Sequence, residues 1–211
     1  LSDKANNTIC SGEDITLSGS NTGYDYTWTK VSGNQSTVVA TNTAGYTPNP
    51  ALTTTGNDLT QRYIASATTN GCTSEESIDI TVHPNATFTL SQSGAACEGN
   101  TVTVTAQGGT ATDFDWLYAN GTPTGITGST NSYLIDANTT TISGKVKGWN
   151  IDNCPSIQSY SITKANKPNV QILRNPAICS GDSPTDTELQ GAANYEWYDG
   201  STYLGNGAKI P

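Results

Sequence analysis

Apolar and polar residues alternate along most of the chain, and this alternation predicts half-buried β-strands. The period-two stretches are IDITVH (78–83), TFTL (87–90), TVTVTA (101–106) and SYSITK (159–164). No stretch of a dozen residues carries apolar positions at helical spacing, and β-branched residues are abundant, so almost no helix is expected. Hairpin tips are expected at Ser32-Gly33-Asn34, Asn120-Gly121 and Asp199-Gly200.

One sequence motif occurs three times. It runs from a cysteine through a strand to an aromatic-x-Trp triplet, and the Cys-to-Trp separations are 18, 19 and 18 residues. The three copies are CSGEDITLSGSNTGYDYTW (10–28), CEGNTVTVTAQGGTATDFDW (97–116) and CSGDSPTDTELQGAANYEW (179–197). An internal period of about 80 to 90 residues indicates tandem small domains.

Pro84 and Pro168 mark the boundaries, since each ends a last strand shortly before the next first strand. We therefore predict a first repeat at 1–83, a second at 84–167 and the N-terminal half of a third at 168–211. The short proline-containing connections predict a semi-rigid string of repeats.

The aromatic residues of the Trp strand lie two apart, so both point to one face of the sheet. Such pairs can form the centre of a two-sheet core. An exposed ligand platform is the alternative interpretation. The core pairs are Tyr26 with Trp28, Phe114 with Trp116, and Tyr195 with Trp197.

The five cysteines lie far apart, without a CxxC and with one histidine in the chain, so zinc-finger and thioredoxin-like motifs are absent. We predict disulfides of Cys10 with Cys72 and of Cys97 with Cys154, because each pair brackets one Trp within one repeat. Disulfides indicate an oxidising compartment. Free buried cysteines in a cytosolic protein are the alternative.

The two ends of the chain look incomplete as repeats. Leu1 falls where the other repeats have Leu90 and Leu173, so most of the first strand is expected to be missing, and Cys179 has no partner in this window. The preferred explanation is a polypeptide that continues at both ends. The alternative is completion of the third repeat by a strand from another chain.

Composition and charge exclude some classes of partner. The apolar fraction is 34%, charged residues make up 13%, and the net charge is −9. An acidic chain repels nucleic acid, and no apolar run is long enough to span a membrane. The chain lacks methionine and a signal-like N-terminus, which suggests a window of a longer protein.

The joint pattern of CSGE, YTW, TNGCTS and TVHP resembles the Ig-like and PKD-like repeats of giant secreted surface proteins of Bacteroidota, including gliding-motility adhesins. WYDGSTYLGNGAKIP (197–211) is similar to the WYD-type hairpin of those repeats, whereas SPTDTEL (183–189) departs from the expected alternation. The resemblance implies an all-β chain of tandem immunoglobulin-like β-sandwich domains. It also implies export by the type IX route and an extracellular stalk or adhesive role.

Catalytic chemistry finds no support in the sequence, because nucleophile–base, GxSxG and P-loop patterns are absent, and no cofactor is predicted. Solvated carboxylates are the favoured interpretation of the acidic turns, with a calcium site as the alternative. We interpret the single histidine, His83, as a solvated linker side chain. The residues weighed for calcium are Asp113, Asp115, Asp152 and Glu13 with Asp14.

The sequence thus predicts a non-catalytic structural or adhesive stalk of an extracellular surface protein. Its partners are neighbouring domains of the same polypeptide, with other surface or secretion-system proteins or glycans as further candidates. The rival hypothesis is a carbohydrate-binding accessory region of a secreted polysaccharide-degrading enzyme. Trp149 is the one residue that favours it, although a core role for Trp149 is the preferred interpretation. A passive subunit of a larger outer-membrane assembly is a third option.

Overall fold

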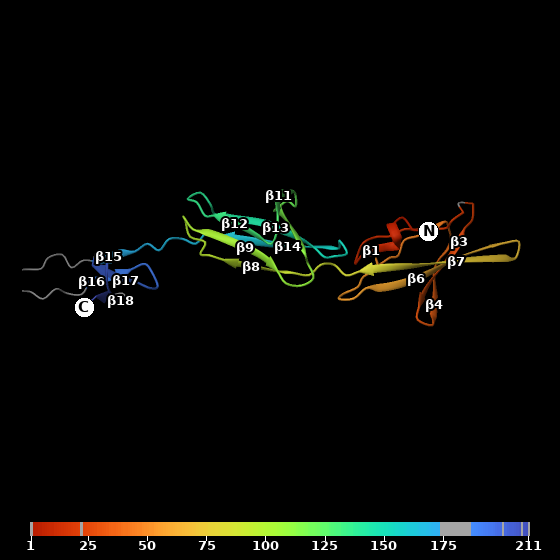
Figure 1. The fold of residues 1–211 in the computed structure, drawn as a ribbon, viewed down its shortest axis with the longest axis horizontal. Coiled ribbons are helices and arrows are strands. Elements are labelled where there is room, and N and C mark those ends of the chain that lie inside the picture. The colour runs from red at the N-terminus through yellow and green to blue at the C-terminus, as the bar shows by residue number, and fades with distance from the viewer. Residues whose placement is uncertain (1, 22, 174–186, 200, 208, 211) are drawn as a thin grey trace, which may run out of the picture.

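A computed structural model describes residues 2–210 apart from 22, 174–186, 200 and 208 (Figure 1). The described structure is built of strands, and a 3-10 turn at Ala5–Asn7 is the one helical element within these residues. The absence of longer helices among the described residues agrees with the alternating pattern. No helix in this part of the chain has the length and apolar character needed to cross a bilayer.

The first repeat is a sandwich of a five-stranded and a two-stranded sheet. The large sheet has the order β1-β7-β6-β3-β4, with β1 parallel to β7 and the other pairs antiparallel. Its strands are β1 (Thr8–Cys10), β7 (Cys72–His83), β6 (Leu59–Thr69), β3 (Tyr26–Ser32) and β4 (Gln35–Thr43), and β2 (Leu17–Ser18) pairs with β5 (Gly45–Tyr46).

The second repeat is a sandwich of a four-stranded and a three-stranded antiparallel sheet. The orders are β11-β10-β13-β14 and β12-β9-β8. The strands are β8 (Thr89–Ser93), β9 (Thr101–Gln107), β10 (Asp113–Tyr118), β11 (Pro123–Thr127), β12 (Thr130–Leu134), β13 (Thr141–Trp149) and β14 (Pro155–Thr163). This arrangement of two packed sheets is immunoglobulin-like, as the sequence predicts.

The C-terminal strands form two small sheets, β15-β16-β19 and β17-β18. Their bounds are β15 (Gln171–Leu173), β16 (Thr187–Gln190), β17 (Glu196–Asp199), β18 (Thr202–Asn206) and β19 (Lys209–Ile210). Gly200 of the predicted turn and the SPTDTEL stretch up to residue 186 lie outside the described residues.

The alternation of the sequence becomes alternate burial in the strands. In β9 the side chains of Val102, Val104 and Ala106 are buried and the threonines between them are not. In β7 the same holds for the last residues only, since its first six residues are exposed. The far half of the β6–β7 hairpin therefore extends beyond the core of its own repeat.

Each of the first two cores contains one fully buried tryptophan, Trp28 at 0% and Trp116 at 1% exposure, with Tyr26 and Phe114 beside them. The Trp116 indole N–H donates to the carbonyl of Gly128 at 2.8 Å. The buried indole N–H of Trp28 has no partner among the described residues. The two cores are alike in packing and differ in this hydrogen bond.

In the C-terminal segment, Tyr195 and Trp197 are half-buried. The Trp197 indole N–H donates to the carbonyl of Gly207 at 2.8 Å, a contact of the same kind as that of Trp116.

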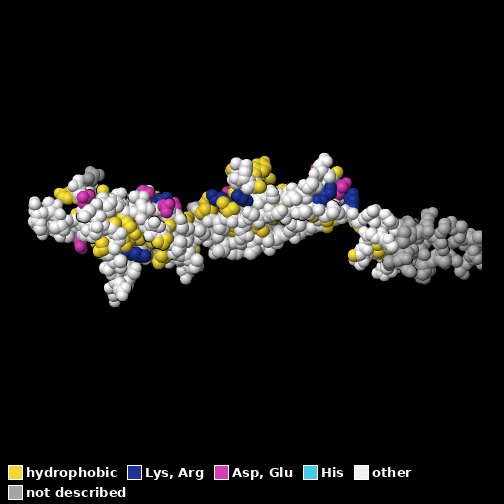
Figure 2. Space-filling model, turned by 180° about the vertical axis from the view of Figure 1, so that it is seen from behind, with side chains coloured by type: hydrophobic (Ala, Val, Ile, Leu, Met, Phe, Trp, Pro, Cys, Tyr) yellow, Lys and Arg dark blue, Asp and Glu magenta, His cyan; other side chains and the backbone are white. Residues whose placement is uncertain are grey.

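The first and second repeats lie end to end (Figure 1). The tip of the β6–β7 hairpin points away from the second repeat, whereas the loop between β13 and β14 reaches the first repeat. The surface is mostly uncharged polar side chains and backbone with scattered charges (Figure 2). No basic stripe is visible on the face drawn, in agreement with the acidic composition.

Candidate functional site: the junction between the first two repeats

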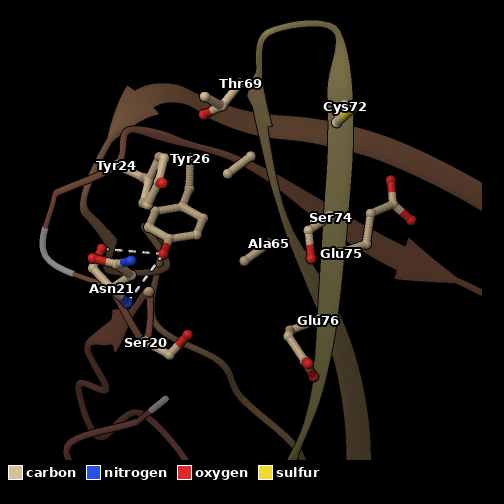
Figure 3. Close-up of a pocket in the computed structure, with 12 residues that line it drawn as sticks. Ser20, Asn21, Tyr24, Tyr26, Ala65, Thr69, Cys72, Ser74, Glu75 and Glu76 are labelled. Carbon is tan, nitrogen blue, oxygen red and sulfur yellow. Dashed lines mark hydrogen bonds between the residues drawn. The ribbon is translucent and has the colours of Figure 1, made fainter.

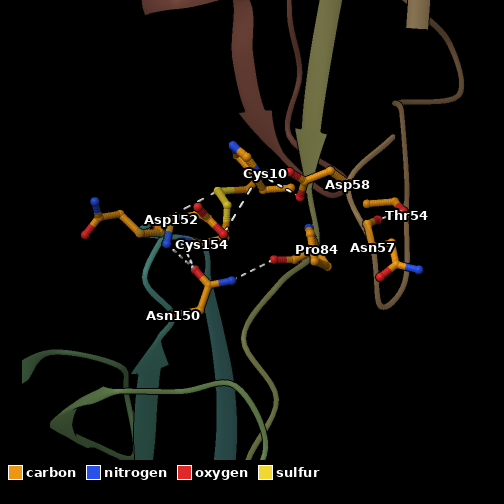
Figure 4. A network of polar contacts seen from close by, with 10 residues as sticks. Cys10, Thr54, Asn57, Asp58, Pro84, Asn150, Asp152 and Cys154 are labelled. Carbon is orange, nitrogen blue, oxygen red and sulfur yellow. Dashed lines mark hydrogen bonds and ion pairs between the residues drawn. A yellow bond between two sulfur atoms is a disulfide. The ribbon is translucent and has the colours of Figure 1, made fainter. Parts of the chain in front are cut away.

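A disulfide joins the first two repeats. Cys10, at the end of β1, bonds to Cys154, in the loop before β14, and the two Cα atoms lie 5.3 Å apart (Figure 4). The bonded residues are separated by 144 positions in the sequence. The structure therefore replaces the predicted pairing within each repeat by a pairing between repeats.

The predicted bond of Cys10 with Cys72 fails because the two cysteines lie at opposite ends of one sheet. Cys10 lies beside His83, the last residue of β7, and Cys72 is the first residue of this 12-residue strand. At 3.3 Å per residue the strand separates them by about 36 Å. A disulfide requires Cα atoms within about 7 Å.

The same geometry excludes the predicted bond of Cys97 with Cys154. The backbone N–H of Ala165, just past the end of β14, donates to the carbonyl of Ala96. Cys154 precedes the other end of β14, whose nine residues span about 27 Å. Cys72 is an exposed free thiol and Cys97 a half-buried one. Cys179 lies outside the described residues.

Asn150 organises the loop that carries Cys154. Its side chain is buried (6% exposed), and its oxygen accepts the backbone N–H groups of Asp152 and Cys154 at 3.1 and 2.8 Å. Its amide nitrogen donates to the carbonyl of Pro84 at 3.0 Å, and the Ala86 N–H donates to the carbonyl of Cys154. The loop of the second repeat thus holds the connection between the repeats.

The turn after Cys10 is held by Glu13, whose carboxylate accepts the Cys10 N–H at 3.1 Å and the Lys4 ammonium at 2.5 Å. The Lys4 hydrogen bond, followed by that of Cys10, lowers the pKa of Glu13. Gly12, at φ +82°, donates its N–H to the Leu52 carbonyl. Asn85 donates to the Ser11 carbonyl, so the connection contacts this turn as well.

His83 is not the solvated side chain that the sequence suggests, since its side chain is 18% exposed. Its Nδ1 lies 2.8 Å from Asp58 and 3.9 Å from Asp152, which belongs to the second repeat. The ligand atoms of these three residues lie within 4.8 Å of one another. An imidazole with two carboxylates suits zinc better than calcium, which prefers oxygen ligands alone.

The other acidic residues weighed for calcium are separately engaged or exposed. Asp113 accepts from the Thr112 hydroxyl, Asp115 accepts from Trp149, and Asp14 is exposed. Asp152 is the one residue of that set that the structure brings into the junction cluster.

Trp149 lies on the outer face of β13, opposite the buried Val146, and is half-buried. Its indole N–H donates to Asp115 at 2.9 Å, and the Lys147 ammonium lies 3.8 Å from the ring centroid. A cation at this distance covers one face of the ring. The ring is thus neither a core residue nor an open stacking platform.

A cavity of about 320 Å³ lies at the opposite end of the first repeat, beside the β6–β7 hairpin (Figure 3). Its walls include Tyr24, Tyr26, Ala65, Cys72 and Glu76. The sequence did not predict this cavity, and it did not predict the roles of Asn150 and Asp58 at the junction. For Asn150 a signal was present, because the Asn-x-Asp-Asn-Cys stretch (150–154) is typical of a turn capped by a side chain.

No family model matches the chain, and no curated protein sequence matches it. Solved structures with similar folds include fibronectin(III)-like modules of Clostridium thermocellum CbhA, at 15% identity and a TM-score of 0.38 over 74% of this chain and 88% of that one. Murine CEACAM1b matches at 14% identity and a TM-score of 0.35 over 76% and 96%. An I-band fragment of titin matches at 14% and 0.32 over 95% and 78%.

Proposed function

We propose that the chain is a non-catalytic stalk module of an extracellular surface protein or fibre, which holds a binding region at a fixed distance and direction. The disulfide between Cys10 and Cys154 is the observation that carries the proposal. A bond inside one domain stabilises that domain, whereas a bond across a junction restricts the angle between two domains.

The contacts around the disulfide support the same role. Pro84 stiffens the connection, and the Asn150 side chain binds its backbone. The junction combines the disulfide, the buried Asn150 amide and a short linker. It therefore resists bending more than a flexible linker would. A disulfide also requires an oxidising compartment, which favours a location outside the cytosol.

The sequence resemblance supports the finer proposals. It favours a secreted surface protein of Bacteroidota, exported by the type IX route and related to gliding-motility adhesins. We assign the repeats to 1–83, 84–167 and 168–211, because the described sheets of each range share no strand. The expected partners are neighbouring repeats of the same polypeptide.

Nuclear magnetic relaxation tests the stalk proposal. In the oxidised chain, backbone amides of the first and second repeats should report one shared tumbling time. The variant Cys10→Ser/Cys154→Ser should show separate, shorter times, while Cys72→Ser, which removes a thiol outside the junction, should behave like the parent chain. Independent tumbling of the two repeats in the oxidised parent chain would contradict a stalk.

Carbohydrate binding is the second candidate, and the partial exposure of Trp149 on the outer face of β13 is the observation that favours it. A pull-down on a panel of insoluble polysaccharides, with Trp149→Ala as the control variant, separates the two hypotheses. The stalk hypothesis expects no retention of either protein. Strong retention that is lost in Trp149→Ala would favour the accessory-region hypothesis.

A further inference from the structure

We propose that Cys72 and Cys97 are attachment points for further repeats of this kind, so that each repeat is bonded to the next through its hairpin cysteine. Cys72 would bond to the first cysteine of a preceding repeat, and Cys97 to the hairpin cysteine of a following one. The inference rests on the proposed stalk role and deepens it by naming the partner. The junction of Cys10 with Cys154 supplies the geometry.

Cys97 sits in the same local structure as Cys10. The N–H of Gly12 donates to Leu52 and that of Glu13 to Cys10. In the second repeat, the N–H of Gly99 (φ +87°) likewise donates to Ile135, and that of Asn100 to Cys97. The first-cysteine turn is thus the same in both repeats, but only the turn of Cys10 is bonded to a hairpin.

The connection after the second repeat is more exposed than the connection after the first. Pro84-Asn85-Ala86 corresponds to Pro168-Asn169-Val170 in the sequence. Ala86 is 3% exposed, and its N–H is bound by the loop of Cys154. Val170, at the equivalent position, is 49% exposed although it is the larger apolar side chain. A hairpin loop seated at Cys97 would cover Val170 as the loop of Cys154 covers Ala86.

Cys72 corresponds to Cys154 on the other side of such a junction. Both lie at the turn between the last two strands of their repeat, just after residues with positive φ. Cys154 directly follows Asn153 (φ 59°), whereas Cys72 follows Asn70 (φ 53°) and Gly71 (φ 81°). The turns differ in length, since Thr69 pairs directly with Cys72 whereas Trp149 pairs with Pro155. The β6–β7 hairpin is exposed over its far half and borders the cavity beside Tyr24.

Charge supplies a second element of recognition. In the observed junction, the basic side chain before the linker proline, His83, faces an acidic residue of the hairpin, Asp152. Lys167 occupies the position of His83 in the second connection. Its ammonium lies 3.4 Å from Glu98 of its own repeat, as His83 lies near Asp58 of its own repeat. Glu75 and Glu76 lie on the hairpin of Cys72. The attachment point at Cys97 therefore has a basic residue before its linker proline, and the hairpin of Cys72 has acidic residues. A basic and an acidic residue at these same two places face each other in the observed junction.

The bond forms from two thiols, which together lose two protons and two electrons. A disulfide oxidant such as oxidised glutathione accepts them by thiol–disulfide exchange and leaves as two thiols. The compartment that oxidises Cys10 and Cys154 supplies this oxidant class.

Two variants of the chain provide the test. Cys97→Ser/Cys179→Ser retains Cys72 as its free thiol, and Cys72→Ser/Cys179→Ser retains Cys97. Equal amounts are equilibrated in a glutathione redox buffer, and the disulfide dimers are counted by intact mass. A statistical 1:2:1 distribution contains as much mixed Cys72–Cys97 dimer as the two homodimers together. We expect this ratio of mixed dimer to homodimers to rise about tenfold, the factor given by about 1.4 kcal/mol of complementary contact. Lys167→Glu in the second variant should reduce this excess.

A statistical distribution, or no dimer of any kind, would overturn the proposal. Peptide mapping of the unreduced natural protein gives the second readout, because it should find Cys72 bonded to a first-cysteine turn of another repeat. Such a bond in monomeric protein assigns the partner to the same polypeptide, and one in oligomers assigns it to a second molecule. If Cys72 is free while the relaxation experiment finds a rigid junction, this inference fails and the stalk role stands.

Discussion

Loss of the disulfide between Cys10 and Cys154 should destabilise the chain far more than the loss of any other single thiol. The bond closes a loop of 144 residues. In the chain-entropy model, opening a loop of this length costs about 5 kcal/mol of unfolding free energy. This magnitude is an upper value, since repeats that fold separately leave part of the loop ordered when one of them unfolds.

The assay is urea unfolding followed by tryptophan fluorescence, because each of the two cores contains a buried tryptophan, Trp28 in the first and Trp116 in the second. With a slope of about 2 kcal/mol per molar urea, the midpoint of the variant Cys10→Ser/Cys154→Ser should lie below that of the parent chain by up to about 2.5 M. Reductant should shift the parent chain equally and leave the variant unchanged. Cys72→Ser is the matched control, and its midpoint should equal that of the parent.

A midpoint that is the same in parent and double variant would refute the reasoning, because it would mean that the junction contributes nothing to stability. A shift of equal size in Cys72→Ser would refute the reasoning as well, since it would indicate that Cys10 bonds to Cys72 within the first repeat.

Three further outcomes are expected. Trp116→Phe should lower the free energy of unfolding by about 1 kcal/mol more than Trp28→Phe, because only Trp116 loses an indole hydrogen bond; thermal unfolding of the two variants measures the difference. Gly109→Ala should unfold the second repeat at lower temperature than Gly121→Ala, since both glycines have positive φ but an added Cβ would lie 2.1 Å from the Thr87 carbonyl only at Gly109. Glu13 should titrate below 4.5 by carbon-detected magnetic resonance; because its folded-state pKa is lowered, its stabilising contribution is present above 4.5 and lost as the pH falls through the folded-state value. A Glu13 midpoint at or above 4.5 would contradict the ion pair with Lys4.

Local patterns along the chain determined the class of fold. Alternation of apolar and polar residues predicts strands because neighbouring side chains of a strand point to opposite faces, and the burial of Val102, Val104 and Ala106 follows that rule. The aromatic-x-Trp spacing predicts buried pairs for the same reason. The Cys-to-Trp period predicts the repeat, and the boundaries at Pro84 and Pro168 stay a prediction.

The cysteine pairing was decided by the tertiary structure alone. Sequence distance favours partners within a repeat, but β1 runs parallel to β7 and so places Cys10 at the far end of the strand that begins with Cys72. The direction in which a strand joins a sheet depends on contacts between residues far apart in the chain, and no local pattern encodes it. For the same reason only the folded chain brings His83, Asp58 and Asp152 together. The sequence determined which residues form strands. The packing of the sheets determined which strand ends lie close enough for their cysteines to bond.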